Sequence, residues 1–396
     1  MGRDGPGWPG MARENGCRAD EPKPRDPAPS VRSVLRIGFV GSGLIAWAHG
    51  LGLKAMIDGD VLDASVVAVH DERERRARRF AESVSTGNEH AVALASAAEV
   101  AARCDAVWVC TPTAAHRGAV DAALAAGCAV FCEKPLSTDL AGAAALVDAV
   151  ETTGVPSQSG LVLRSAPVFR ALRSLVAGGT LGSPMAAVFR DDQYFPVRGT
   201  YASQWRADAD QAGGGCLIEH SIHDVDILRF CFGDVDAISA RTANHAGHRG
   251  VEDLASVSLR FDSGLEAQLT SVWHDIMSRG STRRLEVFCR EGMVWLDDEF
   301  RGPLHIQTSD DMEVRPCPSP EWVDQLPLGD DEIGLALKAY VEADRAFVDA
   351  VVTGLAPDPG LDVALVAHEL VDAAYRSAAG GGGPVRLRRT ERPSQG

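Results

Sequence analysis

A glycine-rich turn between an apolar segment and a helical segment constrains the fold more than any other feature of the sequence. The apolar run 35–40 is typical of a buried strand, and it leads directly into Gly41-Ser42-Gly43-Leu44-Ile45-Ala46, a GxGxxA pattern. The first glycine permits a tight turn, the second lets a pyrophosphate approach the backbone, and the small Ala46 allows close helix packing. With the N–H groups and dipole of the following helix, this pattern predicts a dinucleotide-binding site.

Strand-like and helix-like segments alternate from residue 35 to residue 152. Apolar strands are expected at 35–40, 65–70, 106–110 and 129–133, and helices near 44–56, 73–82, 97–102, 116–126 and 139–152. Alternation at this spacing predicts a Rossmann domain, that is, a doubly wound parallel sheet.

The pattern changes after Gly154-Val155-Pro156. Longer alternating segments at 186–190, 255–261, 266–272 and 284–288 predict a second, α+β domain with a mainly antiparallel sheet. The turn Asp262-Ser263-Gly264 predicts a hairpin between two of them. Helices are expected at 333–352 and 361–378, and a final strand at 385–387.

The chain of 396 residues is long enough for two domains. Residues 1–33 are rich in Gly, Pro, Arg and Asp, so we expect a disordered tail there. We place the Rossmann domain at residues 34–155, the second domain at 156–388, and another tail at 389–396.

Charge and cysteine content exclude several classes of partner. Asp and Glu number 55 against 39 Lys and Arg, and the net charge of -16 would repel nucleic acid. The nine cysteines show no CxxC spacing, which is typical of reduced thiols in a cytoplasmic protein. The sequence lacks a continuous apolar stretch of about 18 residues, so we expect no membrane partner.

An acidic residue follows the second predicted strand. At this place the carboxylate of Asp71 would accept hydrogen bonds from the adenine ribose and repel a 2′-phosphate, which favours NAD over NADP. Arg73, Arg75 and Arg76 could still hold a phosphate. An alternative role for Asp71 is the N-cap of the helix that follows.

The tripeptide Glu133-Lys134-Pro135 ends the last strand of the predicted parallel sheet. Ligands bind at the carboxyl end of such strands, and proline biases the preceding residue toward extended conformations. We therefore expect the Lys134 amine to point into the ligand crevice. A solvated turn is the alternative.

Five segments along the chain carry a family resemblance: GFVGSGLIAWAH, DAVWVCTPTAAH, AGCAVFCEKPLS, GGGCLIEHSIHDVDILRF and GVEDLASVSLRFDSG. Their order and spacing resemble the glucose-fructose oxidoreductase, inositol dehydrogenase and rhizopine-catabolism (Gfo/Idh/MocA) family. The resemblance spans roughly residues 35–388. It implies that the second domain binds substrate and that its large open sheet forms a homodimer or homotetramer.

The resemblance also implies cofactor and substrate contacts. Lys134 would lie near the nicotinamide and the substrate hydroxyl, and Thr111-Pro112 would line the cofactor. Glu133 and His116 are expected to contact the cofactor as well. A structural hydrogen bond at the start of a helix is the alternative for His116.

The segment 213–226 is expected to be the second part of the site. Its three glycines allow close backbone approach, and helical spacing puts Glu219, His223 and Asp226 on one stripe. A carboxylate one turn from an imidazole can orient it for proton transfer. A structural charged pair and a metal site are alternatives, but no further ligand cluster lies nearby in sequence, so we expect no metal.

The family's catalytic pattern is a lysine, an aspartate and, four residues later, a histidine. Lys134 and His223 match this pattern, whereas Glu219 stands where aspartate is usual. The resemblance implies that these three residues are catalytic, although the longer Glu219 side chain puts its contact with substrate in doubt. We expect His223, or Lys134 as a relay, to take the proton of a hydroxyl whose carbon gives a hydride to nicotinamide.

The segment 190–211 faces the active site in this family. We expect Gln193 and Trp205 to bind substrate together with Lys134, Glu219 and His223, because aromatic rings and hydrogen-bonding groups suit a polyol. Many acids in this region raise the possibility of an amino sugar or aminocyclitol. A surface loop with local packing is the alternative.

These observations predict an NAD(P)-dependent oxidoreductase acting on CH–OH groups. The hydride would pass between nicotinamide and a secondary hydroxyl, or ketone, of a sugar, amino sugar or cyclitol. Two alternatives stay open: a cofactor-binding sugar sensor, and a glycoside-cleaving enzyme that uses transient NAD oxidation.

Overall fold

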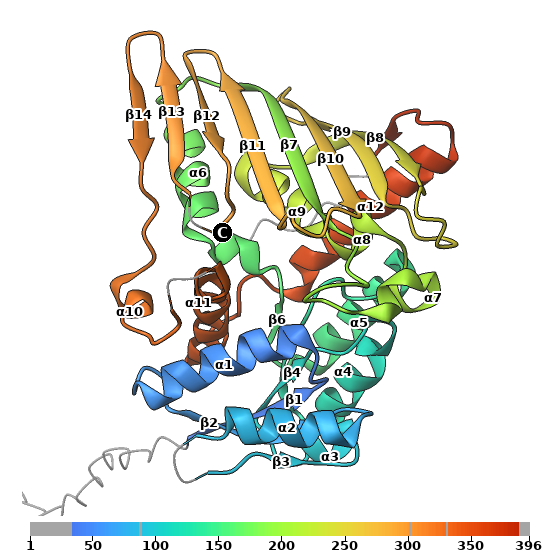
Figure 1. Cartoon of the computed structure of the whole chain (residues 1–396), viewed down its shortest axis with the longest axis vertical. Helices are drawn as coiled ribbons and strands as arrows, with labels where there is room; N and C mark the ends of the chain where they lie inside the picture. Colours follow the sequence, from blue (N-terminus) through green and yellow to red (C-terminus); the bar gives the residue numbers. More distant parts are fainter. Residues whose placement is uncertain (1–33, 87–88, 301, 330–331, 388–396) are drawn as a thin grey trace, which may run out of the picture. The chain divides into compact units, whose positions relative to one another are not determined.

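The computed structural model of the chain describes residues 34–86, 89–300, 302–329 and 332–387 (Figure 1). The two predicted tails, 1–33 and 389–396, lie outside the described residues. No helix within the described ranges is long and apolar enough to cross a membrane.

The first half of the described chain forms a six-stranded sheet with the order β3-β2-β1-β4-β5-β6, and all neighbouring strands in it are parallel. The strands are β1 (Leu35–Val40), β2 (Ala64–His70), β3 (Val92–Ala93), β4 (Ala106–Val109), β5 (Ala129–Cys132) and β6 (Ser157–Ser159). The helices are α1 (Leu44–Asp58), α2 (Glu74–Val84), α3 (Ala97–Ala101), α4 (His116–Ala125) and α5 (Leu140–Thr153). This is the strand order of a Rossmann domain, and the predicted fold class is confirmed.

The second half forms a nine-stranded sheet with the order β14-β13-β12-β11-β7-β10-β9-β8-β15 (Figure 1). The strands are β7 (Pro184–Tyr194), β8 (Val235–Ala243), β9 (Leu254–Phe261), β10 (Glu266–His274), β11 (Thr282–Cys289), β12 (Gly292–Leu296), β13 (Leu304–Thr308), β14 (Met312–Arg315) and β15 (Val385–Arg386). Only β7 and β10 pair in parallel, and the predicted hairpin joins β9 to β10. The mainly antiparallel sheet is therefore confirmed.

The nine-stranded sheet has one buried face. Buried and more exposed residues alternate along β9, β10 and β11. This is the pattern of an antiparallel sheet that packs on one side only. The buried side packs against helices that include α6 (Pro167–Gly178), α9 (Ile222–Phe232) and α12 (Leu361–Ala379).

The predicted boundary after residue 155 precedes β6. Because β6 pairs with β5, this boundary would separate one strand from the parallel sheet. We propose that the first domain continues through Ser159. The second sheet begins with β7, after α6.

The last two long helices run back against the Rossmann half. They are α11 (Glu332–Thr353), which packs on α1, and α12, which packs on α5 and on β8 (Figure 1). Both helices were predicted from the sequence to within about one residue. Their return brings residues from the end of the chain next to the carboxyl end of β5.

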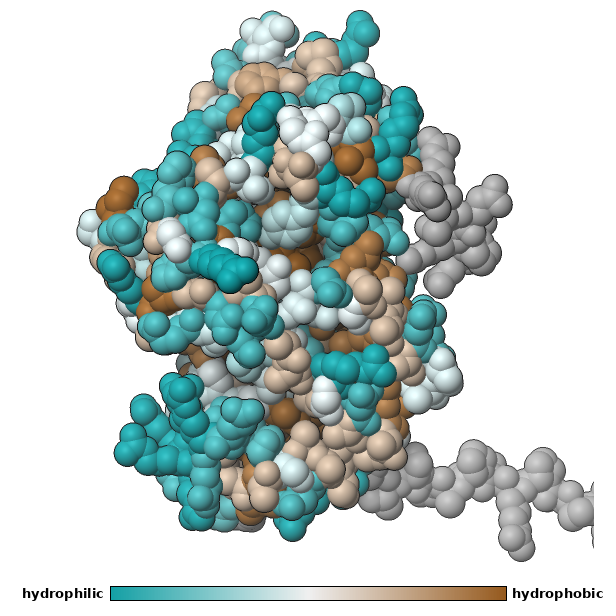
Figure 2. All heavy atoms as spheres, turned by 90° about the vertical axis from the view of Figure 1, so that its right-hand side faces the viewer, coloured by the Kyte–Doolittle hydropathy of each residue, from teal (hydrophilic) through white to brown (hydrophobic). Residues whose placement is uncertain are grey.

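Hydrophobic and hydrophilic residues are distributed differently between the core and the surface of the protein. Figure 2 shows hydrophilic residues mixed with weakly hydrophobic ones on one face, and strongly hydrophobic residues in several recesses between them. The largest fully buried side chains are aromatic, among them Trp108, Phe131 and Phe347. These rings pack on one another where α11 meets the parallel sheet.

A buried polar contact accompanies this aromatic packing. His49 of α1 lies between two carboxylates, with Nδ1 2.6 Å from Asp344 Oδ1 of α11 and Nε2 3.0 Å from Glu133 Oε1. Trp108 Nε1 donates to the same Asp344 oxygen at 2.9 Å. Burial alone would lower the pKa of His49, but Asp344 and Glu133 outweigh it and raise the pKa to about 10. His49 is therefore a buried cation at neutral pH.

We predict that the free energy of unfolding falls as the pH rises from the ordinary histidine pKa, about 6.5, toward the raised pKa of His49, about 10. The folded protein keeps a proton in this range that the unfolded chain loses, so His49 contributes a slope of about 1.4 kcal/mol per pH unit. Urea unfolding at several pH values measures the slope. His49→Gln should make it shallower by that amount, and an equally steep fall in the variant would contradict the assignment.

Candidate active site

The glycine turn between β1 and α1 has the predicted geometry. Gly41 adopts φ +94°, and a Cβ atom there would lie 2.5 Å from the Cys110 carbonyl oxygen. Gly43 is the N-cap of α1, has no side-chain capping bond, and faces open space where a Cβ would be. Leu44 and Ile45 begin α1, and Ala46 is fully buried. An uncapped helix terminus beside open space fits a dinucleotide phosphate.

Asp71 lies directly against this turn. Its Oδ2 accepts hydrogen bonds from the Ser42 backbone N at 2.9 Å and from the Ser42 hydroxyl at 2.7 Å. Its Oδ1 accepts from the Arg73 backbone N at 2.9 Å. The N-cap residue of α2 is Arg73, so Asp71 supports the start of that helix without being its cap. Its place fits the acidic residue that binds the adenine ribose in NAD-binding folds.

The Thr111-Pro112 loop follows β4, the neighbour of β1 in the sheet. The Thr111 hydroxyl oxygen is buried and has no hydrogen-bond partner among the described residues. His116 Nε2 lies 3.1 Å from the Thr111 carbonyl oxygen, and burial lowers the pKa of His116. His116 thus supports the loop in its neutral form, which is the structural alternative considered for it.

Lys134 points from the end of β5 toward the second half of the chain. Its ammonium donates a hydrogen bond to the Glu219 carbonyl oxygen at 2.8 Å. Glu133 is buried, and its carboxylate contacts His49 and accepts from the Lys134 backbone N at 3.2 Å. The tripeptide is therefore not a solvated turn. In this structure the Glu133 carboxylate faces protein groups, so its predicted cofactor contact stays a prediction.

The prediction of one continuous helix after the three glycines is wrong. The structure has two helices, α8 (Cys216–Glu219) and α9 (Ile222–Phe232), separated by His220 and Ser221. The Ser221 hydroxyl donates to Asp191 Oδ2 at 2.9 Å and lies 2.6 Å from the Ser271 hydroxyl. His220 Nε2 lies 3.2 Å from Asp191 Oδ1. These contacts with β7 and β10 accompany the break.

Glu219 ends α8, whereas His223 and Asp226 lie together in α9, so the expected stripe of all three residues is interrupted, and each carboxylate contacts an arginine. Glu219 Oε2 lies 2.9 Å from Arg206 Nε. Asp226 accepts two hydrogen bonds from Arg164, both 2.7 Å long. Burial alone would raise the pKa of Glu219, but Arg206 and Lys134 outweigh it and lower the pKa. Glu219 is therefore ionised and paired at neutral pH.

His223 is a buried and neutral imidazole. It is almost fully buried, and its Nδ1 has no hydrogen-bond partner among the described residues. Burial, together with the positive charges of Lys134 and Arg283, lowers its pKa well below the ordinary value. The imidazole is thus neutral at neutral pH, and one nitrogen is available to a ligand.

The three glycines bring the backbone against other segments of the protein. A Cβ at Gly213 would lie 2.3 Å from the Thr138 carbonyl oxygen, and one at Gly215 would lie 1.8 Å from that of Glu252. The Glu252 carboxylate accepts from the backbone N of Gly215 at 2.8 Å and of Leu217 at 3.0 Å. Glu252 thus fixes the start of α8. The sequence analysis missed this role, although Glu252 lies in a segment that carries the family resemblance.

Gln193 and Trp205, two of the five predicted substrate-binding residues, lie on different elements. Gln193 is buried at the end of β7, and its Oε1 has no partner among the described residues. Trp205 is partly buried, and the Arg206 guanidinium lies 4.6 Å from its ring centre. Arg206 therefore connects Trp205 to Glu219.

Arg283 of β11 forms a second buried charge cluster that sequence reasoning missed. It contacts Asp191 at 3.5 Å, Asp224 at 2.6 Å and Glu299 at 3.1 Å. Burial raises the pKa of both Asp224 and Glu299 to about 7, although Arg283 opposes the shift. The partners are separated by 16 to 92 positions in sequence, so no local pattern could have found the cluster.

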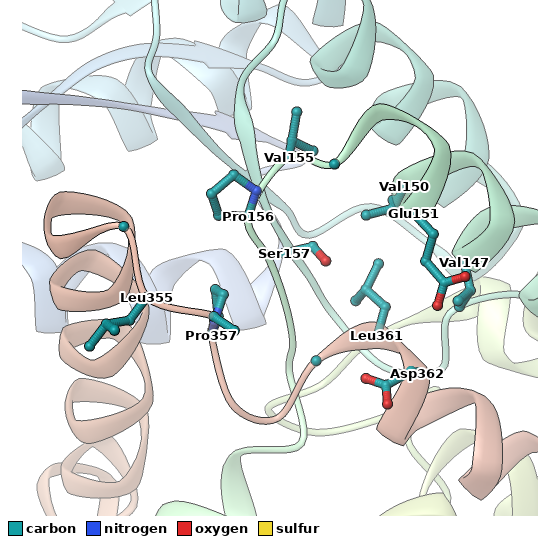
Figure 3. Close-up of a pocket in the computed structure, with 14 residues that line it drawn as sticks. Val147, Val150, Glu151, Val155, Pro156, Ser157, Leu355, Pro357, Leu361 and Asp362 are labelled. Carbon is teal, nitrogen blue, oxygen red and sulfur yellow. The ribbon is translucent and has the colours of Figure 1, made fainter. Parts of the chain in front are cut away.

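A surface hollow of about 390 Å³ lies elsewhere (Figure 3). It is lined by the end of α5, the loop between α11 and α12, and the first turn of α12, including Val150, Glu151, Leu355 and Asp362. Ser157, also in its lining, pairs with Val130 near the amino end of β5. The hollow is therefore at the opposite end of the strands from Lys134. Among the described residues no group of three or more His, Cys, Asp or Glu side chains could hold a metal ion.

Comparison with known proteins identifies the class of protein to which this chain belongs. The model described as "Oxidoreductase family, NAD-binding Rossmann fold" matches residues 35–161, and the "GFO/IDH/MocA C-terminal domain" matches residues 169–295. The protein is thus an oxidoreductase with an NAD-binding Rossmann domain. It belongs to the Gfo/Idh/MocA family, as the sequence motifs predicted.

Individual relatives agree with this assignment. An inositol 2-dehydrogenase of Rhizobium meliloti (strain 1021) is 30% identical over 353 residues, which cover 87% of this chain and 97% of the relative. A 1,5-anhydro-D-fructose reductase of Ensifer adhaerens is 32% identical over 59% of this chain and 68% of the relative. The crystal structure of a putative myo-inositol dehydrogenase from Sinorhizobium meliloti 1021 is 26% identical, with a TM-score of 0.70 over 89% of this chain and 100% of that one.

We predict that Gly215→Ala destabilises the protein by about 2 to 4 kcal/mol, because its Cβ would collide with the Glu252 backbone. Gly118→Ala is the matched control, since it lies in α4 and its Cβ would face open space. That change should stabilise the protein by about 0.5 kcal/mol. Thermal unfolding of the two variants checks the pair, and equal stabilities would refute the close approach.

Proposed function

We propose that this protein is an NAD-dependent dehydrogenase that transfers a hydride between nicotinamide and a secondary hydroxyl, or ketone, of an uncharged sugar or cyclitol. The observation that carries the proposal is the position of Lys134. Lys134 follows the carboxyl end of β5, next to the switch point between β1 and β4. Its ammonium donates a hydrogen bond to the Glu219 carbonyl oxygen at 2.8 Å. Ligands of open α/β sheets bind at this edge.

The residues of the first half fit NAD. The Gly41–Ala46 turn and the uncapped start of α1 would hold the pyrophosphate, and Asp71 would accept from the ribose hydroxyls. The unpaired Thr111 hydroxyl would contact the part of the cofactor beyond the turn. When bound, NAD supplies the hydride acceptor.

Lys134 and His223 would both interact with the substrate oxygen. The Lys134 ammonium would donate a hydrogen bond to that oxygen and stabilise negative charge on it as the proton leaves. The neutral imidazole of His223 would accept the proton. Glu219 would act differently from the usual aspartate, because its main-chain carbonyl contacts Lys134 and its carboxylate orients Arg206.

The charge of the site favours an uncharged substrate. Among the buried acids of residues 191–226, Glu219 contacts Arg206, Asp226 contacts Arg164, and Asp191 and Asp224 share Arg283. Relatives with the names inositol 2-dehydrogenase, 1,5-anhydro-D-fructose reductase and D-apiose dehydrogenase act on polyols of this kind. An amino sugar or aminocyclitol is therefore the less favoured substrate.

We further propose a homodimer or homotetramer that forms through the open face of the nine-stranded sheet. Val188 of β7 and Phe288 of β11 are 47% and 38% exposed on this face. Covering such side chains stabilises association. The cytoplasm is the compartment we propose, because the eight described cysteines are all free and seven of them are buried.

We predict that Lys134→Met lowers turnover by about 10³-fold and leaves the NAD dissociation constant nearly unchanged. Absorbance of reduced nicotinamide at 340 nm, with a panel of inositols and free sugars, measures turnover. Lys54→Met is the matched control, because Lys54 also donates to a main-chain carbonyl, that of Ser85 at 2.7 Å. Undiminished turnover in the Lys134 variant would contradict the catalytic role proposed for Lys134. Binding of NAD with no reduction by any substrate would instead favour a sensor.

We also predict that kcat/KM for a neutral cyclitol exceeds that for the analogue with one amino group by at least about 10-fold. The reason is that Lys134 and Arg206 would repel an ammonium ion, while the buried acids are already paired. Paired assays near neutral pH compare the two substrates. A preference for the amino analogue would show that one of these acids leaves its arginine to bind substrate.

A further inference from the structure

The main chain is held on both sides of Lys134 by buried histidines from distant parts of the sequence. On one side, His49 Nε2 of α1 lies 3.0 Å from Glu133 Oε1. On the other side, His368 Nε2 of α12 accepts a hydrogen bond from the Leu136 backbone N at 3.0 Å. Both side chains are at most 2% exposed. The segment 133–136 is thus anchored before and after the lysine.

His49 is protonated and His368 is neutral. Each protonation state matches the hydrogen bonds that the ring makes. His49 lies between the carboxylates of Glu133 and Asp344, which keep it protonated so that both ring nitrogens donate. His368 must accept from an N–H group, which only a neutral ring nitrogen can do. Burial lowers its pKa to about 4, in agreement with that requirement.

Glu133 links His49 directly to the main chain of Lys134. One carboxylate oxygen of Glu133 receives His49, while the other accepts from the Lys134 backbone N at 3.2 Å. A Cβ at Gly160 would lie 2.3 Å from Glu133 Oε1, so the absence of a side chain there leaves room for this carboxylate. The bridge therefore fixes the main chain of Lys134 itself.

We propose that His49 and His368 are positioning residues for Lys134. They fix the main chain on both sides of the lysine, and so they hold its ammonium where it meets the Glu219 carbonyl oxygen and the substrate hydroxyl. The inference rests on the proposed function of Lys134 in the dehydrogenase reaction. Neither histidine touches the substrate, since both act through residues 133–136.

His368 offers the cleaner test. In His368→Gln the side-chain oxygen can still accept from the Leu136 N–H, whereas in His368→Leu it cannot. A displaced catalytic group costs rate more than it costs cofactor binding. We expect His368→Leu to lower kcat by about 10- to 100-fold, with the NAD dissociation constant and KM changed by less than about 3-fold. His368→Gln should restore kcat to within about 3-fold of the wild type.

A control separates positioning from general loss of stability. The Ser377 hydroxyl, also buried on α12, accepts from the Ala240 backbone N at 2.9 Å and donates to the Gly383 carbonyl. Ser377→Ala should destabilise the protein to a degree comparable with His368→Leu and leave kcat unchanged. Equal losses of kcat in these two variants, or no loss in either, would overturn the proposal.

Hydrogen exchange gives a readout that does not depend on activity. Exchange of the Leu136 amide should speed up at least about 10-fold in His368→Leu and stay near the wild-type rate in His368→Gln. If none of the substrates tested led the wild type to reduce NAD, the proposed function would fail. The exchange rate of the Leu136 amide would still test whether His368 anchors this segment. Equal protection of Leu136 in both variants would refute the anchor whatever the activity.

His49 is tested in the same assays through Asp344→Asn, which keeps the histidine in place and removes one of its two carboxylates. We expect a kcat reduced by about 10-fold with unchanged NAD affinity. Wild-type kcat in folded Asp344→Asn would remove His49 from the proposal.

Discussion

The hydrogen bond from the Lys134 ammonium to the Glu219 carbonyl oxygen joins the two halves of the site. At 2.8 Å, it connects the end of β5 in the parallel sheet with the end of α8 in the second half. Both partners need a fixed main chain for this contact to form. Buried histidines hold the segment around Lys134, and the Glu252 carboxylate, with the close approach at Gly215, holds the start of α8.

Pairing of buried charges is the second constraint. Desolvation of a carboxylate is costly unless a cation or several donors compensate it. Around Lys134 the compensation is supplied by arginines, namely Arg206 for Glu219 and Arg283 for Asp191 and Asp224. His223 Nδ1 has no hydrogen-bond partner in the described part of the chain, and burial together with the surrounding positive charge keeps the ring neutral. Lys134 is thus a cationic donor and His223 a neutral imidazole, which are the two groups that the proposed reaction of an alcohol would use.

Much of the fold follows from local patterns. The strand 35–40, the glycine turn, Asp71 and the lysine at the end of β5 were all predictable, because period, turn chemistry and strand ends are encoded within a few residues. The break at His220 and Ser221 was not, since it is held by Asp191 and Ser271 from two other strands. Arg283, His49 and His368 were missed for the same reason, because their partners are close only in the folded chain.

The most direct test of the account is a crystal structure of the protein with NAD and a non-reacting polyol. The account predicts that one polyol hydroxyl lies within about 3.2 Å of both Lys134 Nζ and a ring nitrogen of His223. It also predicts that the carbon bearing this hydroxyl faces C4 of the nicotinamide. A polyol bound away from Lys134, or a nicotinamide ring outside the crevice at the end of β5, would contradict it.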